Sequence, residues 1–243
     1  MIWGQIMTYE SMEEVAFRQR LLTSPGERGE VDYKASARFD GNDSYTLKLI
    51  RHIQGMANSV GGWLVIGYVE SRNTLPELDP NHSEEICASY DPTQVTNRVN
   101  SFIARRQRID LTIYFEIHPD TGIRHPIIQV NGFDRLPYVC RSDQDATDSG
   151  DKILRQGAVY VRRSSAETSE VSTPEDWEDL VNRCVRLRRD EFLIEFRELF
   201  ERMTAPKFPT PSTPSPSTKE ELLVWMDRMQ KRSLEEPEKG DGR

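Results

Sequence analysis

Residues 49–70, with the sequence LIRHIQGMANSVGGWLVIGYVE, constrain the fold more than any other part of this chain. The first half carries apolar residues at intervals of three and four positions, which is the spacing of one helical face. These residues are Leu49, Ile50, Ile53, Met56 and Ala57. Gly61 and Gly62 end the pattern, since glycine takes the left-handed conformation at a helix C-terminus without a steric clash. We expect at least one of the two glycines to have a positive φ.

A strand is predicted directly after the two glycines. Residues 63–69, WLVIGYV, are apolar at almost every position, which is typical of a strand covered on both faces. Glu70 follows at the point where this buried run meets solvent. A helix, a glycine turn and a central strand with a carboxylate at its exit therefore form the expected centre of the fold.

The rest of the chain predicts an α/β (α+β) fold, with a mixed central sheet and flanking helices. Further helices are expected at residues 12–22, 92–103 and 174–203, each preceded by a residue that can cap a helix N-terminus. Further strands are expected at residues 30–34, 111–118, 127–130 and 158–161, with the second and third joined as a hairpin.

The expected organisation has five parts. They are a helical lead-in at 1–26, an α/β domain at 27–171, a long helix at 172–203, a Pro/Ser/Thr linker at 204–218, and a short amphipathic helix with a charged tail at 219–243. The linker composition cannot build a core. A helix tethered by such a linker usually docks in a groove, so residues 219–232 are expected to bind a protein partner.

Charge and cysteine content limit the function classes. The net charge of −8 argues against a general polyanion binder, although a local basic groove is compatible with it. The three cysteines lie far apart and show no CxxC spacing, so they indicate neither a zinc site nor a disulfide framework. No apolar run approaches the roughly 18 residues of a membrane span, and no signal peptide is recognisable. We expect a cytoplasmic protein without a membrane segment.

Carboxylates near one lysine suggest a metal site. Asp32 and Lys34 share one face of the strand at 30–34, Glu70 ends the neighbouring strand, and Glu27 lies just upstream. Such carboxylates would bind Mg²⁺ or Mn²⁺, which activates water for attack on a phosphate, while the lysine adds a cation. The alternative is a solvated strand face with a minor ion pair.

Two of the three arginine clusters are candidate phosphate contacts. The first contains Arg105, Arg106 and Arg108, and the second contains Arg162 and Arg163. Both would hold nucleic-acid phosphates, although arginines at a helix C-terminus also complement the helix dipole. The third cluster, Arg183, Arg186, Arg188 and Arg189, is interpreted as a solvated helix face paired with neighbouring acids. The four histidines share no ligand spacing and are interpreted as surface or packing residues.

Three motifs resemble the Schlafen-type AlbA-like domain over about residues 27–171. Glu27-x4-Asp32-Tyr33-Lys34 matches an acid, four residues, an acid, an aromatic or aliphatic residue and Lys. Residues 56–67, MANSVGGWLVIG, match A-N-[ST]-x-G-G-x-L-x-I-G, and residues 157–165, GAVYVRRSS, are similar to G-x-x-Y-x-R-x-G-S.

The resemblance implies a nucleic-acid-binding domain, which in the Schlafen branch is an RNase with three carboxylates and a divalent metal. Those carboxylates fall on Glu27, Asp32 and Glu70. The sequence departs from the pattern with Asp as the second acid, Glu as the third, and no counterpart of the animal Schlafen zinc site. Many bacterial relatives keep the acids and are described only as DNA- or ATP-binding regulators.

We therefore expect a nucleic-acid-binding protein with a candidate metal-dependent endoribonuclease site for structured RNA such as tRNA. The alternatives are a non-catalytic DNA- or RNA-binding regulator, and an adaptor subunit of a larger assembly, for example in defence. Two copies of the domain form the RNA cleft in the Schlafen family, and this chain shows one. We therefore also expect a homodimer.

Overall fold

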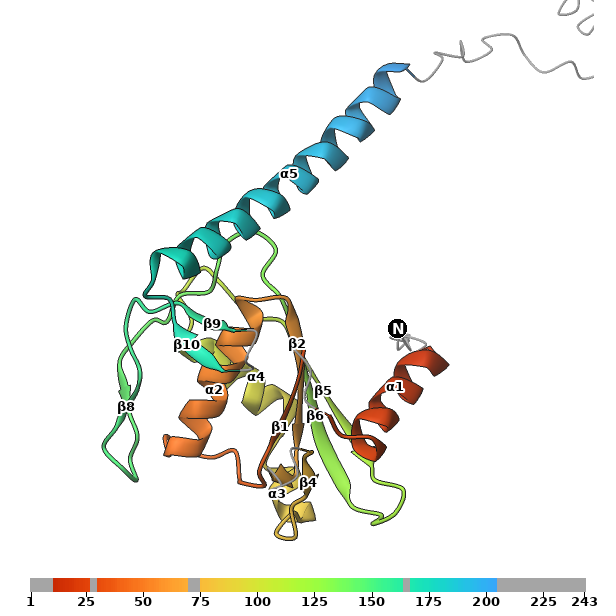
Figure 1. Ribbon diagram of the computed structural model, residues 1–243, viewed down its shortest axis with the longest axis vertical. Coiled ribbons are helices and arrows are strands. Elements are labelled where there is room, and N and C mark those ends of the chain that lie inside the picture. The colour runs from red at the N-terminus through yellow and green to blue at the C-terminus, as the bar shows by residue number, and fades with distance from the viewer. Residues whose placement is uncertain (1–10, 27–29, 70–74, 164–166, 205–243) are drawn as a thin grey trace, which may run out of the picture. The chain divides into compact units, whose positions relative to one another are not determined.

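The computed structural model describes residues 11–26, 30–69, 75–163 and 167–204 (Figure 1). Glu27 and Glu70 lie outside the described residues, as do the linker after Thr204 and the expected helix at 219–232. The chain divides into two compact units, Met1–Leu193 and Ile194–Arg243, and the fold below is that of the first.

A mixed four-stranded sheet forms the centre of this unit. β1 (Val31–Lys34) runs parallel to β2 (Gly61–Ile66), and α2 (Ser44–Ala57) connects the two strands. β6 (Arg124–Asn131) is antiparallel to β2, and β5 (Leu111–Ile117) is antiparallel to β6, which gives the order β1-β2-β6-β5. The expected α+β class with a mixed sheet and flanking helices is confirmed.

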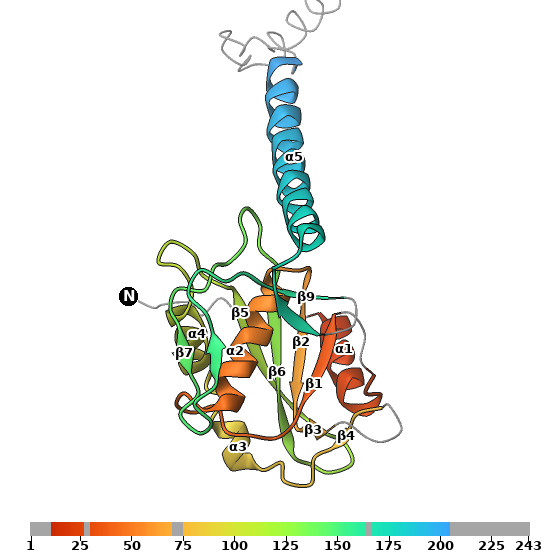
Figure 2. The ribbon, with the colours of Figure 1, turned by 60° about the vertical axis from the view of Figure 1, so that its left-hand side comes forward.

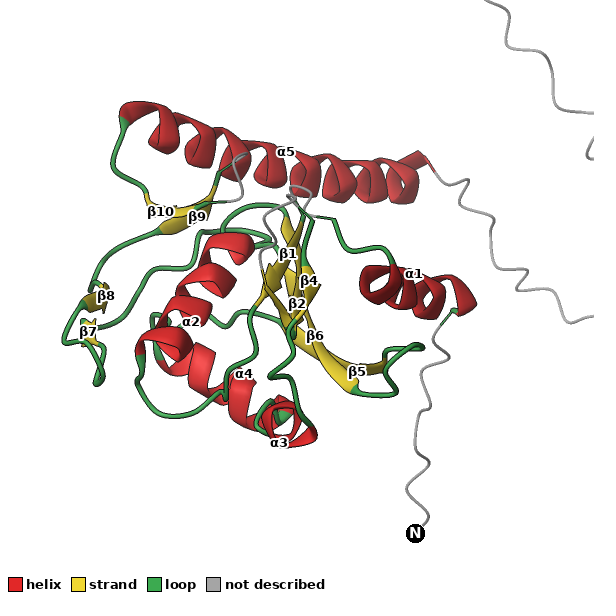
Figure 3. Ribbon diagram, turned by 60° about the horizontal axis from the view of Figure 1, so that its bottom comes forward, coloured by secondary structure: helices red, strands yellow, loops and turns green. Residues whose placement is uncertain are grey.

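Helices cover both faces of the sheet (Figure 3). α2 and α4 (Pro92–Ser101) pack on one face, where Leu64 and Ile66 belong to the larger apolar core. α1 (Met12–Thr23) packs on the other face, over a smaller core that includes Val65. Strand alternation explains this division, because successive side chains of β2 point to opposite faces.

The helix starts predicted at residues 12, 92 and 174 are confirmed, and α2 is capped in the same manner. Ser11 caps α1 in a capping box with Glu14, and Asp43 caps α2 by accepting a hydrogen bond from the Thr46 amide. Asp91 caps α4 in the same way. α5 (Pro174–Thr204) begins after Thr173, whose hydroxyl accepts from the Asp176 amide at 3.2 Å.

The glycines act differently from the expectation. Gly61 (φ +82°) and Gly62 (φ +152°) both have positive φ, as predicted, but they open β2, and Asn58 caps α2. The run at 63–69 is not one strand, because Gly67 (φ +106°) separates β2 from β3 (Tyr68–Val69). A Cβ at Gly67 would lie 2.5 Å from Nδ1 of His125, so this position accepts only glycine.

Several short elements complete the unit. They are β4 (Glu77–Leu78), α3 (Glu84–Ala88), β7 (Gln144–Asp145), β8 (Lys152–Leu154), β9 (Tyr160–Arg162) and β10 (Thr168–Glu170). β7 and β8 form a hairpin, while β9 and β10 form a second hairpin beside α2 (Figure 2). None of the described helices is long and apolar enough to span a bilayer.

Candidate functional site

Asp32 is a buried carboxylate that contacts two cations. It lies in the middle of β1 and is 2% exposed. The Lys34 ammonium lies 3.0 Å from Oδ1 and 2.9 Å from Oδ2, and Arg162 Nη1 donates to Oδ2 at 2.8 Å. The interpretation of this strand face as solvated is therefore wrong. The pairing of Asp32 with Lys34 is present as the sequence suggested, and the Arg162 contact is an addition.

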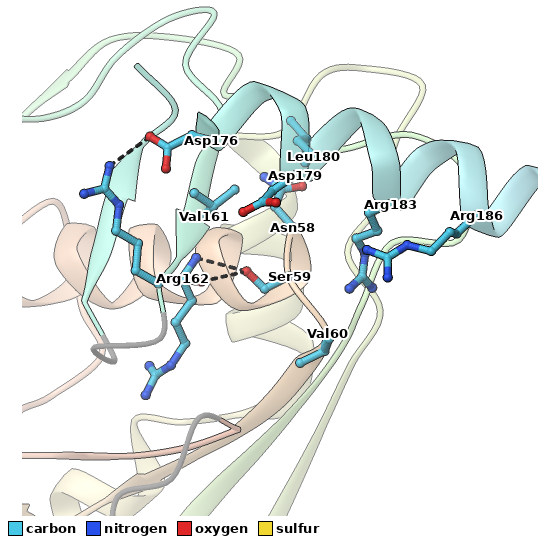
Figure 4. Close-up of a pocket in the computed structure, with 11 residues that line it drawn as sticks. Asn58, Ser59, Val60, Val161, Arg162, Asp176, Asp179, Leu180, Arg183 and Arg186 are labelled. Carbon is cyan, nitrogen blue, oxygen red and sulfur yellow. Dashed lines mark hydrogen bonds and ion pairs between the residues drawn. The ribbon is translucent and has the colours of Figure 1, made fainter. Parts of the chain in front are cut away.

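Backbone contacts bring Arg162 to Asp32. The Arg162 amide at the end of β9 donates to Ser59 Oγ at 3.0 Å, and the Ser59 hydroxyl donates back to the Arg162 carbonyl at 3.2 Å (Figure 4). Asn58 donates to the Tyr160 carbonyl at 2.9 Å. The two residues after α2 therefore fix β9, and the Arg162 side chain extends from it to β1.

The two cations beside Asp32 outnumber its single negative charge. Burial alone would raise the pKa of Asp32, but Lys34 and Arg162 outweigh it, and the net pKa is lowered. The carboxylate is thus ionised at neutral pH and faces two cations.

His52 completes this cluster from α2. Its Nδ1 lies 4.0 Å from Asp32 Oδ2 and 2.9 Å from the Thr168 hydroxyl. Burial, together with the nearby charge of Lys34, lowers the His52 pKa to about 4, so the ring is neutral at pH 7. The sequence did not predict His52 or the Asp32–Arg162 contact, because residues 20 and 130 positions from Asp32 share no spacing signal with it.

The described residues alone do not form a metal site. Of the three predicted metal ligands, the structure describes only Asp32, and both of its oxygens already accept hydrogen bonds from cations. A metal ion at this carboxylate would have to displace Lys34 or Arg162. Among the described residues, no group of three His, Cys, Asp or Glu side chains could hold a metal. Mg²⁺ or Mn²⁺ binding that includes Glu27 and Glu70 stays a prediction.

The first arginine cluster lies in an exposed turn. Arg105, Arg106 and Arg108 follow α4, which ends earlier at Ser101, so they do not occupy its last turn as expected. The helix-dipole explanation therefore does not apply to them. The carbonyl of nearby Asp110 accepts from the Asn131 amide at 3.1 Å, which places this turn at the end of the sheet where β6 finishes.

Both arginines of the second cluster and two of the third line a cavity of about 500 Å³ at the same end of the sheet. Residues 58–60 after α2, the end of β9 and the first turns of α5 enclose it (Figure 4). Its charged lining residues are Arg162, Arg163, Asp176, Asp179, Arg183 and Arg186. Arg163 donates to Asp176 at 2.8 Å. Because Arg162 is paired with Asp32, three guanidinium groups face two carboxylates, which leaves a positive lining in a chain whose net charge is −8.

Three histidines form a second titratable cluster, near Gly67 where β2 ends and β6 begins. The His82 and His125 rings stack at 4.2 Å, and the His118 ring centre lies 6.0 Å from that of His125. All three are buried, and burial lowers the pKa of His125 to about 4. They are packing residues, as the sequence suggested, but their proximity was not predicted.

Comparisons with known proteins add little. No protein-family model matches the sequence, and no curated protein sequence matches it. The DIP2311 protein from Corynebacterium diphtheriae is a structural neighbour at 19% identity and a TM-score of 0.37. That match covers 68% of this chain and 31% of the other, so this chain spans about a third of its length. The N-terminal domain of a RecG-related putative ATP-dependent DNA helicase from Nitrosomonas europaea matches at 14% identity and a TM-score of 0.31. That match covers 57% of this chain and 84% of the other.

Proposed function

We propose that this protein binds nucleic acid through the end of the sheet where β2 begins and β6 finishes. The observation that carries the proposal is the gathering of arginines at this end in an otherwise acidic chain. They come from the turn after α4, the end of β9 and the first half of α5. Guanidinium groups make charge-assisted, often bidentate contacts with phosphates. The Schlafen AlbA-like motifs, which imply a nucleic-acid-binding domain, support the same function.

The binding surface consists of exposed side chains, and Arg162 does not belong to it. Its side chain is 2% exposed and is paired with Asp32, so it positions β9 and β1 instead of contacting a ligand. Arg105, Arg106 and Arg108 are exposed and have no carboxylate partner within the described part of the chain. These three side chains are therefore free to contact phosphates.

Fluorescence anisotropy with a labelled RNA hairpin and a DNA duplex tests this function. We expect the full chain to bind at 50 mM KCl and to weaken steeply with salt. A triple Arg105→Gln, Arg106→Gln, Arg108→Gln variant should reduce affinity at least tenfold. Its salt slope should fall by roughly 0.7–0.9 for each phosphate that the variant no longer neutralises.

The matched control removes three cations elsewhere, in Arg124→Gln, Lys152→Gln, Arg155→Gln. Each of these side chains is exposed and paired with a carboxylate. We expect the affinity of this triple control variant for RNA and DNA to stay within twofold of that of the wild type. If the wild-type chain binds neither RNA nor DNA at 50 mM KCl, the proposed function is wrong.

A metal-dependent endoribonuclease site is a second candidate, favoured by the ionised Asp32 beside Lys34. The Asp32–Arg162 pair weighs against it, because this carboxylate is already neutralised. Incubation of the full chain with tRNA, with and without Mn²⁺, separates the two functions. Cleavage that requires Mn²⁺ and is abolished in Glu27→Gln or Glu70→Gln would support the nuclease. Absence of cleavage would leave a binding protein.

The homodimer also belongs to this proposal. A second copy would double the arginines at the binding surface and steepen the salt dependence of RNA binding. Light scattering at micromolar concentration, free and with RNA, should give twice the chain mass. A strict monomer in both samples would exclude the dimer.

A further inference from the structure

The cavity beside α5 contains two arginines whose charge has no counterpart within the described residues. Arg183 and Arg186 lie on α5, and Figure 4 shows both side chains extending to the same side of the helix. None of the ion pairs of the described residues includes either side chain. The interpretation of this cluster as a helix face paired with acids is wrong for these two residues.

Seven other arginines of the unit do pair with acids. Arg18, Arg124, Arg135, Arg155, Arg162, Arg163 and Arg189 each lie within 3.4 Å of a carboxylate. Asp179, one helical turn before Arg183, lines the cavity but forms no ion pair with either arginine. The missing pairs are therefore not explained by a local shortage of acids.

The polar groups of Arg183 are only partly satisfied. Its guanidinium carbon lies 4.8 Å from the centre of the Phe133 ring, which is a favourable cation–π contact, but its Nε is buried without a hydrogen-bond partner among the described residues. Burial, followed by the like charge of Arg186, lowers the pKa of Arg183. Two adjacent guanidinium groups, one of them partly buried, form an arrangement that an anion would stabilise.

The chemistry favours a phosphate as that anion. Two guanidinium groups can each donate in parallel to the oxygens of one phosphate or of adjacent phosphates. The cavity lies at the same end of the sheet as the turn that contains Arg105, Arg106 and Arg108. A nucleic-acid backbone crossing that turn could reach α5 as well.

We propose that Arg183 and Arg186 hold a backbone phosphate of the bound nucleic acid in this cavity. The inference rests on the proposed function, and it gives α5, which lies beyond residues 27–171, a defined phosphate contact. Arg163 belongs to the cavity wall but stays tied to Asp176.

The test compares two double variants of the full chain by anisotropy with the same RNA and DNA probes. Arg183→Gln, Arg186→Gln should weaken binding at least tenfold at 100 mM KCl and lower the salt slope by roughly 1.4–1.8, the value for two phosphates left without a cation. Arg188→Gln, Arg189→Gln removes the same charge from exposed positions on the same helix, and should stay within twofold of the wild type.

Two further controls separate the loss of a phosphate contact from a loss of folding or of charge alone. Because Arg183 packs on Phe133, the thermal midpoint of each variant is measured, and Arg186→Gln alone serves as the variant at an exposed position. We expect Arg186→Gln to weaken binding severalfold with an unchanged midpoint. Arg183→Lys, Arg186→Lys should keep most of the salt slope.

The outcomes separate this inference from the proposed function. If the wild type binds RNA or DNA and the Arg183→Gln, Arg186→Gln variant binds no more weakly than the Arg188→Gln, Arg189→Gln variant, the phosphate site is wrong. The proposed function then stands. If the wild type binds no nucleic acid, pyrophosphate is added in a thermal-shift assay. A stabilisation that disappears only in Arg183→Gln, Arg186→Gln would then reassign the cavity to a small phosphate ligand and overturn the nucleic-acid assignment.

Discussion

Asp32, Lys34 and Arg162 form a buried ionic contact between β1 and β9. Removing one member of such a contact leaves an uncompensated charge in the interior, which is more costly than replacing both partners with apolar groups. Asp32 is 2% exposed, and the Arg162 side chain is equally inaccessible. The pair therefore joins the β9–β10 hairpin to the central sheet, whatever else Asp32 does.

A double-mutant cycle tests this role. Asp32→Ala should lower the free energy of unfolding by about 3–5 kcal/mol, because Arg162 stays buried without its main partner. Arg162→Met should cost a similar amount, and the double variant should cost clearly less than the sum. Urea unfolding followed by circular dichroism measures all four proteins. Additive single effects would show that the two side chains are not coupled.

The buried His125 and the partly buried His52 predict an acid-sensitive fold. The pKa values of His125 and His52 fall from 6.5 to about 4, chiefly through burial. The unfolded chain therefore binds protons below about pH 6.5 while the folded chain stays neutral, so stability falls between about pH 6.5 and 4. Each shift corresponds to roughly 3 kcal/mol.

Thermal midpoints measured from pH 7.5 to 4 check this expectation. A His125→Gln variant should be less stable at pH 7, because it cannot make the ring's hydrogen bond to the Ile66 carbonyl, yet its midpoint should change less with pH. A wild-type midpoint that is constant down to pH 4.5 would contradict the burial argument.

Spacing in the sequence predicted some of these contacts and missed others. Asp32 and Lys34 lie two positions apart on a strand, so their shared face could be predicted. The contacts of Asp32 with Arg162 and His52 depend on how β9 and α2 pack on β1, which no local pattern encodes. The three-histidine cluster was missed for the same reason.

At the scale of elements, the glycine pair that opens β2 gives a direct test. Gly61 has φ +82°, and a Cβ there would lie 2.5 Å from the Val130 carbonyl oxygen. Gly150 has a similar φ of +74°, but a Cβ there would meet nothing within 4 Å. Gly61→Ala should therefore add a steric clash to a backbone strain that both substitutions share.

We expect Gly150→Ala to cost about 1 kcal/mol and Gly61→Ala at least twice as much, since only the second forces β2 away from β6. Differential scanning calorimetry on both variants gives the comparison. Equal thermal midpoints for the two would mean that the sheet adjusts freely at Gly61.

Helix starts were well predicted because capping side chains act locally. Strand ends were not, and the break at Gly67 depends on the approach of the His125 ring. α5 shows a similar limit. Leu180 is buried in the core while Trp177, Val181 and Val185 are exposed, and helical spacing alone does not distinguish these positions.

At the scale of the whole molecule, the mixed sheet and flanking helices were predictable from periodicity and the motif resemblance. The order of the strands was not, because β1 and β2 are parallel and β6 pairs with β2 only after the long segment that contains α3, α4 and β5. Long-range pairing of this kind depends on tertiary packing, which single-sequence patterns do not contain.

The wide separation of Asp32 and Arg162 has a consequence for how the chain folds. The β5–β6 hairpin joins neighbouring segments, so it can close within microseconds, whereas the two charged partners lie 130 residues apart. Closing so long a loop is entropically costly until the intervening elements have packed. The ion pair should therefore form after the rate-limiting barrier. In stopped-flow chevron experiments, Asp32→Ala should accelerate unfolding and leave the refolding rate nearly unchanged. A refolding rate that slows in proportion to the decrease in stability would instead place this contact in the folding nucleus.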